Sequence, residues 1–217
     1  MKGLLIKDLR LLGGQKTFFG ALIVIAAGMT LFTEDTTFAV GFLALVASMF
    51  SLSSISYDEM DNGNAFLFCL PISRAVYAAE KYCFGLLLGT GAWLAATLFV
   101  LCVNAYKRAA LPLDILLSSL MLLPLILLMQ ALVLPFDLKF GSERGRIAIL
   151  GALGLLVLLG VLAVKGAEAA GIDLAAVLDS LPPLNMGLLI AAALLVSLVL
   201  WLLSMRISIS IVKKKEF

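Results

Sequence analysis

The sequence has no histidine and few charged residues for its length. Of its 217 residues 14% are charged and 63% are hydrophobic, and the mean hydropathy is +1.13. A soluble domain carries roughly a quarter charged residues, and a chain of this size cannot bury so many apolar side chains in one core. The missing histidines remove the commonest general base and metal ligand. The composition therefore excludes an ordinary soluble domain.

Cysteine and net charge are also sparse. Cys69, Cys83 and Cys102 form no CxxC pair and no disulfide framework. The net charge of +2 is too small to indicate nucleic-acid binding.

Six apolar stretches without Asp, Glu, Lys or Arg approach the length of a membrane span. A hydrocarbon core of about 30 Å needs about 20 residues of helix, and these stretches lack the alternation of barrel strands. We therefore predict an all-α polytopic membrane protein in which residues 1–217 form a single transmembrane domain. The predicted spans are 18–32, 38–55, 83–104, 115–136, 147–164 and 186–205.

The distribution of basic residues predicts the orientation. Of the 16 Lys and Arg residues, thirteen fall before the first span, after the last span, or in the loops 56–82 and 137–146. Short cytoplasmic loops carry such an excess. Both termini are therefore expected in the cytoplasm.

The first 16 residues predict an amphipathic helix at the membrane interface. Basic residues gather on one side of the helical wheel and leucines on the other, although Asp8 and Ile6 interrupt the pattern. Gly13 and Gly14 would end this helix before the first span. A frayed tail is the alternative.

The sequence contains no motif for nucleotide or catalytic chemistry. Lys16-Thr17 lacks the glycines of a P-loop, and neither GxSxG nor HExxH occurs. The spans hold no ionisable residue for a buried proton relay. We predict no catalytic, cofactor or metal site on this chain, so any ATP would be hydrolysed on a separate subunit.

The 56–82 loop is longer than a connection between two spans requires. An acidic opening at Asp58 and Glu59 leads through an Asn-Gly turn into the apolar stretch 65–70, which Pro71 ends. Ser73 can cap a following helix. The apolar stretch is either a segment in the lipid headgroup zone or an exposed docking surface. The 137–146 loop is short, basic and glycine-containing, which is also typical of a plain solvated loop.

Three segments resemble the small ABC-2 type permeases, the membrane halves of ABC exporters. They are the N-terminal MKGLLIKDLRLL, the YDE…LPISR…Y…EKY pattern of the 56–82 loop, and FDLKFGSERGR at 136–146. The resemblance covers nearly the whole chain and is greatest to the membrane subunits of exporters of phenol-soluble modulins, which are amphipathic peptides.

This resemblance implies a permease in a bacterial plasma membrane that pairs with a second permease copy or a paralogue. It also implies two separate ATPase subunits, which bind ATP and Mg²⁺. The 56–82 loop would carry a coupling helix at about 61–74, and the 137–146 loop would make a smaller second contact. The coupling residues would be Asp58, Glu59, Asn64, Phe66, Phe68, Leu70, Pro71, Ser73, Arg74, Phe140, Glu143 and Arg144.

Glycines in two spans predict close helix packing. Gly85 and Gly89 form a GxxxG pair, and Gly151 and Gly154 occur in the fifth predicted span. They are expected to serve packing within the bundle or a dimer seam. Trp201 is expected to anchor its span at the interface.

The uncharged spans suit an amphipathic peptide or a lipid-like cargo. Other readings remain open: a non-transporting membrane immunity or interaction protein against antimicrobial peptides, and an intramembrane enzyme, which the missing catalytic residues disfavour.

Overall fold

The computed structural model describes residues 1–32, 36–60, 63–107, 111–169 and 186–215, with the side chains of 64, 65 and many residues between 142 and 169 outside this description. The elements of the described part are all helical. They are α1 (Lys2–Gly14), α2 (Lys16–Phe32), α3 (Thr36–Glu59), α4 (Gly63–Cys69), α5 (Arg74–Lys107), α6 (Pro112–Leu120), α7 (Leu122–Ala169) and α9 (Met186–Lys214).

Four helical segments of the described residues are long and apolar enough to cross a membrane. They are α3, α5, the segment Pro112–Gly141 and α9. These contain four of the six predicted spans, and the all-helical membrane architecture is confirmed. In lipid such helices satisfy their backbone polar groups internally.

The other two predicted spans are not among the described single helices that are long and apolar enough to cross a membrane. The span 18–32 lies in α2, which qualifies only together with α1, and the two helices are bent by 70° at Gln15. The span 147–164 lies in the second half of α7, which is not among the described span candidates. Six spans and the orientation of the termini therefore stay predictions.

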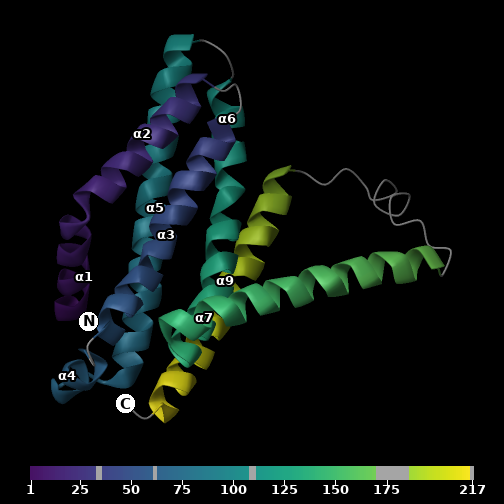
Figure 1. Cartoon of the computed structure of the whole chain (residues 1–217). Helices are drawn as coiled ribbons and strands as arrows, with labels where there is room; N and C mark the ends of the chain where they lie inside the picture. The colour runs from purple at the N-terminus through teal and green to yellow at the C-terminus, as the bar shows by residue number, and fades with distance from the viewer. Residues whose placement is uncertain (33–35, 61–62, 108–110, 170–185, 216–217) are drawn as a thin grey trace.

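Both chain termini and the short helix α4 lie at the same end of the bundle, which we call the terminal end (Figure 1). The helices α3 and α5 pack along each other, as do the first half of α7 and α9. The second half of α7 runs away from the other helices (Figure 1).

A hydrogen-bonded amide joins three helices inside the bundle. Gln130 Nε2 on α7 donates to Ser48 Oγ on α3 at 2.6 Å, and Trp201 Nε1 on α9 donates to Gln130 Oε1 at 2.9 Å. Trp201 is 5% exposed and packs edge-on against Tyr82. The prediction of an interfacial anchor at Trp201 is therefore wrong, because its indole N–H has a partner inside the bundle.

Two of the predicted packing glycines lie where helices approach closely. A methyl carbon added at Gly85 would lie 3.0 Å from Ser51 Oγ, and one at Gly89 would lie 2.9 Å from Ile126 Cγ2. These positions let α5 contact α3 and α7. In contrast, a methyl carbon at Gly151 or Gly154 would meet nothing within 4 Å among the described atoms.

The predicted 137–146 loop is helical on both sides of a single break. Gly141 has φ +80°, a conformation that side-chain-bearing residues rarely adopt, and α7 changes direction there. Charges and glycines are also typical of a solvated loop, so the sequence pattern alone does not predict a helix here. One positive-φ glycine is sufficient to turn the helix.

Candidate functional site

The coupling segment predicted at about 61–74 is a helix over a shorter range. The helix α4 covers Gly63–Cys69, and α5 begins at Arg74 after a non-helical connection. Asp61 lies outside the described residues. The predicted length was too great because Leu70 to Ser73 around Pro71 do not continue the helix.

The three central side chains of α4 have different environments. Phe66 is 74% exposed, whereas Leu67 is 8% exposed and belongs to the hydrophobic core of the terminal end. The ring of Phe68 packs edge-on against Tyr77 with 5.5 Å between centroids, and the Arg74 guanidinium lies 5.8 Å from the Phe68 ring. Thus α4 fixes one face to the bundle and presents Phe66 outward.

The start of α5 is capped and tied to the C-terminal tail. The backbone N–H of Val76 donates to Ser73 Oγ at 3.3 Å, an N-cap of the expected type. Arg74 Nη1 donates to the carbonyl oxygens of Lys213 and Lys215, at 3.1 and 2.6 Å. The residues that follow α4 are therefore held against the end of α9.

A buried ionic cluster joins α1 to the helices on either side of α4. Lys81 Nζ on α5 lies 2.6 Å from Asp8 Oδ2 on α1 and 2.7 Å from Asp58 Oδ2 on α3. The Lys81 side chain is fully buried, and those of Asp8 and Asp58 are 1% and 8% exposed. Lys7 forms ion pairs with both carboxylates, and Ser54 Oγ donates to Asp8.

Two cations and three carboxyl groups thus meet in this cluster, because the fully buried Glu80 also lies 3.7 Å from Lys81. We call it the ionic cluster (Lys7, Asp8, Ser54, Asp58, Glu80 and Lys81). Burial alone would raise the pKa of Asp8, but Lys81, Ser54 and Lys7 outweigh it and hold that pKa below its ordinary value. The Asp8 side chain is accordingly a charged partner of Lys81.

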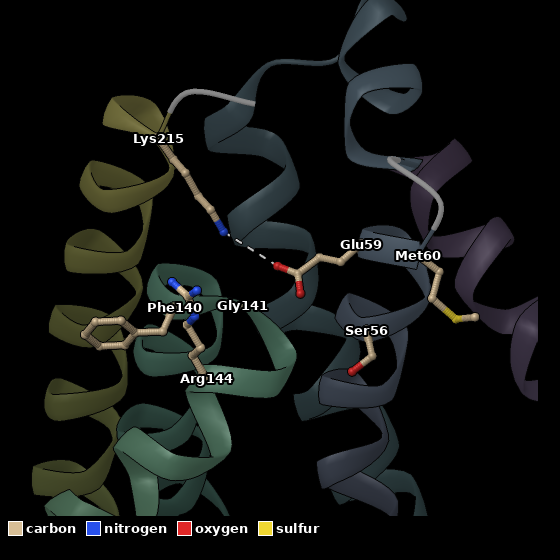
Figure 2. A pocket seen from close by; sticks show the side chains of 7 residues that line it. All are labelled: Ser56, Glu59, Met60, Phe140, Gly141, Arg144 and Lys215. Atoms are coloured by element: carbon tan, nitrogen blue, oxygen red, sulfur yellow. Dashed lines mark ion pairs between the residues drawn. The ribbon is translucent and has the colours of Figure 1, made fainter.

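The bend of α7 and the end of α3 enclose a pocket of about 430 Å³ at the terminal end. It is lined by Ser56, Glu59, Met60, Phe140, Gly141, Arg144 and Lys215. Figure 2 shows Lys215 reaching from the end of α9 toward Glu59, with the ammonium and carboxylate 3.6 Å apart. Lys215 Nζ also donates to the Leu138 carbonyl oxygen at 3.2 Å. Residues of both predicted cytoplasmic loops and of the C-terminal tail therefore meet at this pocket.

Most of the predicted coupling residues lie at the terminal end, although Asp58 is buried there. Asp58 belongs to the ionic cluster, Glu59, Phe140 and Arg144 line the pocket, and Leu70, Pro71 and Ser73 follow α4. The side chains of Asn64 and Glu143 lie outside the described residues.

The sequence reasoning missed the partners of Asp58. Asp8 interrupts the predicted amphipathic pattern, and Lys81 counts among the basic residues of the 56–82 segment, on the helix that Ser73 was expected to cap. The sequence signal is a carboxylate on the apolar side of a helix, which is costly to bury unless a cation or hydrogen bonds compensate it.

The site consists of a short helix, a buried ionic cluster and a pocket at the terminal end. No group of three or more Cys, Asp and Glu side chains among the described residues is placed to hold a metal ion. Its exposed features are an aromatic residue on α4 and a pocket with both charge signs, which are typical of a surface that binds another protein.

The long apolar helices define a multi-pass membrane protein. Comparison with known families gives the particular family: residues 3–213 match the ABC-2 family transporter proteins, and the chain belongs to that family. No curated protein and no solved structure matches the chain significantly. Membership indicates a permease-type membrane subunit and implies an ABC ATPase as its partner.

Proposed function

We propose that this chain is the permease subunit of an ATP-driven exporter, and that α4 docks into a separate ATPase subunit. The observation that carries the proposal is the two-sided environment of α4. Leu67 is buried in the bundle while Phe66, its neighbour, is 74% exposed at the end of the molecule. An exposed aromatic on a fixed helix is a typical anchor in a protein interface.

The pocket at the bend of α7 would make the second, smaller contact. Phe140 is 42% exposed and Arg144 is exposed beside it. An acidic side chain of the ATPase would meet Arg144 and Lys215 at this place, with Phe140 and Met60 as its apolar surroundings.

In this mechanism two permease chains and two ATPase subunits form the exporter. ATP with Mg²⁺ is bound and hydrolysed on the ATPases, and their closure moves α4 as part of a rigid unit. Moving a two-state equilibrium from 1:99 to 99:1 requires about 5.5 kcal/mol, which two ATP molecules per dimer can supply.

The cargo we propose is an amphipathic peptide of the phenol-soluble modulin type or a lipid-like molecule. The predicted spans carry no Asp, Glu, Lys or Arg, so the permeation path suits apolar surface rather than a small ion. Both termini would lie in the cytoplasm of a bacterial cell and α4 on the same side as the ATPases. A non-transporting immunity protein would have no need of an exposed aromatic on α4.

The test compares Phe66→Asp with Phe66→Leu in the full chain, purified from its native membrane with any bound ATPase. Phe66→Asp should abolish ATPase co-purification and peptide-stimulated hydrolysis, because a carboxylate would replace the docked ring. Phe66→Leu should retain most of both, since it keeps an apolar anchor.

A third variant controls for folding. Leu67→Ala should lower the stability of the permease by about 2–5 kcal/mol, as truncation of a buried leucine does, whereas Phe66→Asp should leave thermal stability in detergent unchanged. A Phe66→Asp protein that binds its ATPase and transports peptide normally would contradict the docking role of α4.

A further inference from the structure

An apolar hollow of about 180 Å³ lies between α2, α3 and α5, away from the terminal end. Small residues make it: Ala26 and Ala27 on α2, Ala39 on α3, and Ala95 and Ala96 on α5 are among those that line it. It opens toward lipid, because Ile23 and Phe99 at its edge are 60% and 43% exposed. The bundle therefore leaves unfilled space where acyl chains surround it.

The described residues that line the hollow are apolar except for Thr30. The Thr30 hydroxyl donates to the Ala26 carbonyl oxygen at 2.8 Å. A hollow of this kind stays dry and accepts apolar ligands. Its lining therefore suits an apolar occupant.

A cation lies at one end of the hollow. Lys107 Nζ donates to the carbonyl oxygens of Thr30 and Leu31, at 3.3 and 2.8 Å. An ammonium group has three donors, and two of them bond the carbonyl oxygens at the end of α2. Lys107 is exposed, and its neighbour Tyr106 is 92% exposed. Exposed tyrosine at the end of a span is typical of the headgroup level.

The depth of the hollow matches a phospholipid. From Thr30 to Ile23 the helix α2 rises about 10 Å at 1.5 Å per residue, about a third of a 30 Å hydrocarbon core. The cation lies at the interfacial end and the alanines lie deeper. A phosphate beside Lys107 would place the first part of an acyl chain along Thr30, Ala27 and Ile23.

We propose that this hollow binds one acyl chain of an anionic phospholipid, with the lipid phosphate at Lys107, in the leaflet opposite the terminal end. The proposal does not depend on the cargo or on ATPase docking. It assigns a specific lipid to a site that the packing of α2 against α3 and α5 leaves open.

The test reconstitutes the full chain into vesicles with spin-labelled phosphatidylglycerol or phosphatidylcholine and measures the motionally restricted lipid. Ala27→Phe fills the mouth of the hollow and should remove about one restricted phosphatidylglycerol per chain. Ala21→Phe is the matched control, because Ala21 is an exposed residue of α2 that does not line the hollow. It should leave the restricted fraction unchanged.

Charge variants test the headgroup. Lys107→Gln should lower the preference for phosphatidylglycerol over phosphatidylcholine by about two- to five-fold, as the loss of one exposed ion pair allows, and Lys107→Arg should retain it. The proposal is overturned if Ala27→Phe behaves like Ala21→Phe, or if Lys107→Gln keeps the full preference. It is also overturned if Ala27→Phe alone changes the oligomeric state, since the hollow would then receive a second copy of the chain.

Discussion

Replacing Lys81 by Met should be among the most destabilising single changes at the terminal end. The Lys81 side chain is fully buried, and its ammonium lies within 2.7 Å of carboxylate oxygens of both Asp8 and Asp58. Ser54 Oγ accepts a further hydrogen bond from it at 2.5 Å. Methionine fills a similar volume, so the variant removes the charge and leaves the carboxylates with Lys7 alone.

The magnitude follows from the burial of the partners. Removing one member of a buried ion pair costs about 3–5 kcal/mol, because the remaining charge is left uncompensated. For a chain of 150–250 residues, 1 kcal/mol corresponds to about 2–4 °C in Tm. Lys81→Met should therefore lower Tm by roughly 6–20 °C.

The assay is thermal unfolding of the purified chain in detergent, followed by size-exclusion chromatography. Lys2→Met is the control, because Lys2 is exposed on the same α1 that carries Asp8; its Tm should change little. The double variant Asp8→Asn with Lys81→Met should recover part of the loss, since it removes one of the carboxylates that Lys81 neutralises. If Lys81→Met shifts Tm no more than Lys2→Met, the reasoning about a dry ionic cluster is refuted.

Two further predictions concern the same bundle. Gly89→Val should destabilise the bundle by about 1–3 kcal/mol through overpacking, because the added carbon would lie 2.9 Å from Ile126 Cγ2. Gly91→Val should be tolerated, because an added carbon there meets nothing within 4 Å. Equal Tm values for the two variants would contradict this packing. The effect of Asp8→Asn on Tm should depend on pH. The lowered pKa of Asp8 means that its charge stabilises the fold above about pH 4, and that this contribution is lost as pH falls through the folded-state pKa. The Tm gap between wild type and Asp8→Asn should therefore close toward low pH. A gap that widens toward low pH would contradict a stabilising charge on Asp8.

The helical membrane fold could be predicted because long uncharged apolar runs allow few other structures in lipid. The cap at Ser73 and the breaks near Gly13 and Pro71 follow from local chemistry that acts within a few residues. The bend at Gly141 could not be distinguished from a loop, since a glycine permits positive φ without requiring it.

The ionic cluster and the position of Trp201 depend on which helices become neighbours. Asp8 and Lys81 are 73 residues apart, and Trp201 meets Gln130 across 71 residues. No periodicity within one helix encodes such pairs. The sequence does show a charge on an apolar helix face, which indicates that a partner exists but not which residue it is.

The packing of the terminal end explains why a force on α4 would reach the whole bundle. A helix of seven residues is not stable by itself, so α4 keeps its shape through Leu67 and Phe68. Leu67 belongs to a single core that includes Leu4, Tyr77, Leu138 and Val212, from α1, α5, α7 and α9. Close-packed interiors transmit strain, so a displacement of α4 is shared among these helices. The opposite end has a smaller core around Val40 and Val100 beside the apolar hollow. In the proposed mechanism, the larger core beside the exposed Phe66 would carry this displacement, while the smaller core lies at the opposite end.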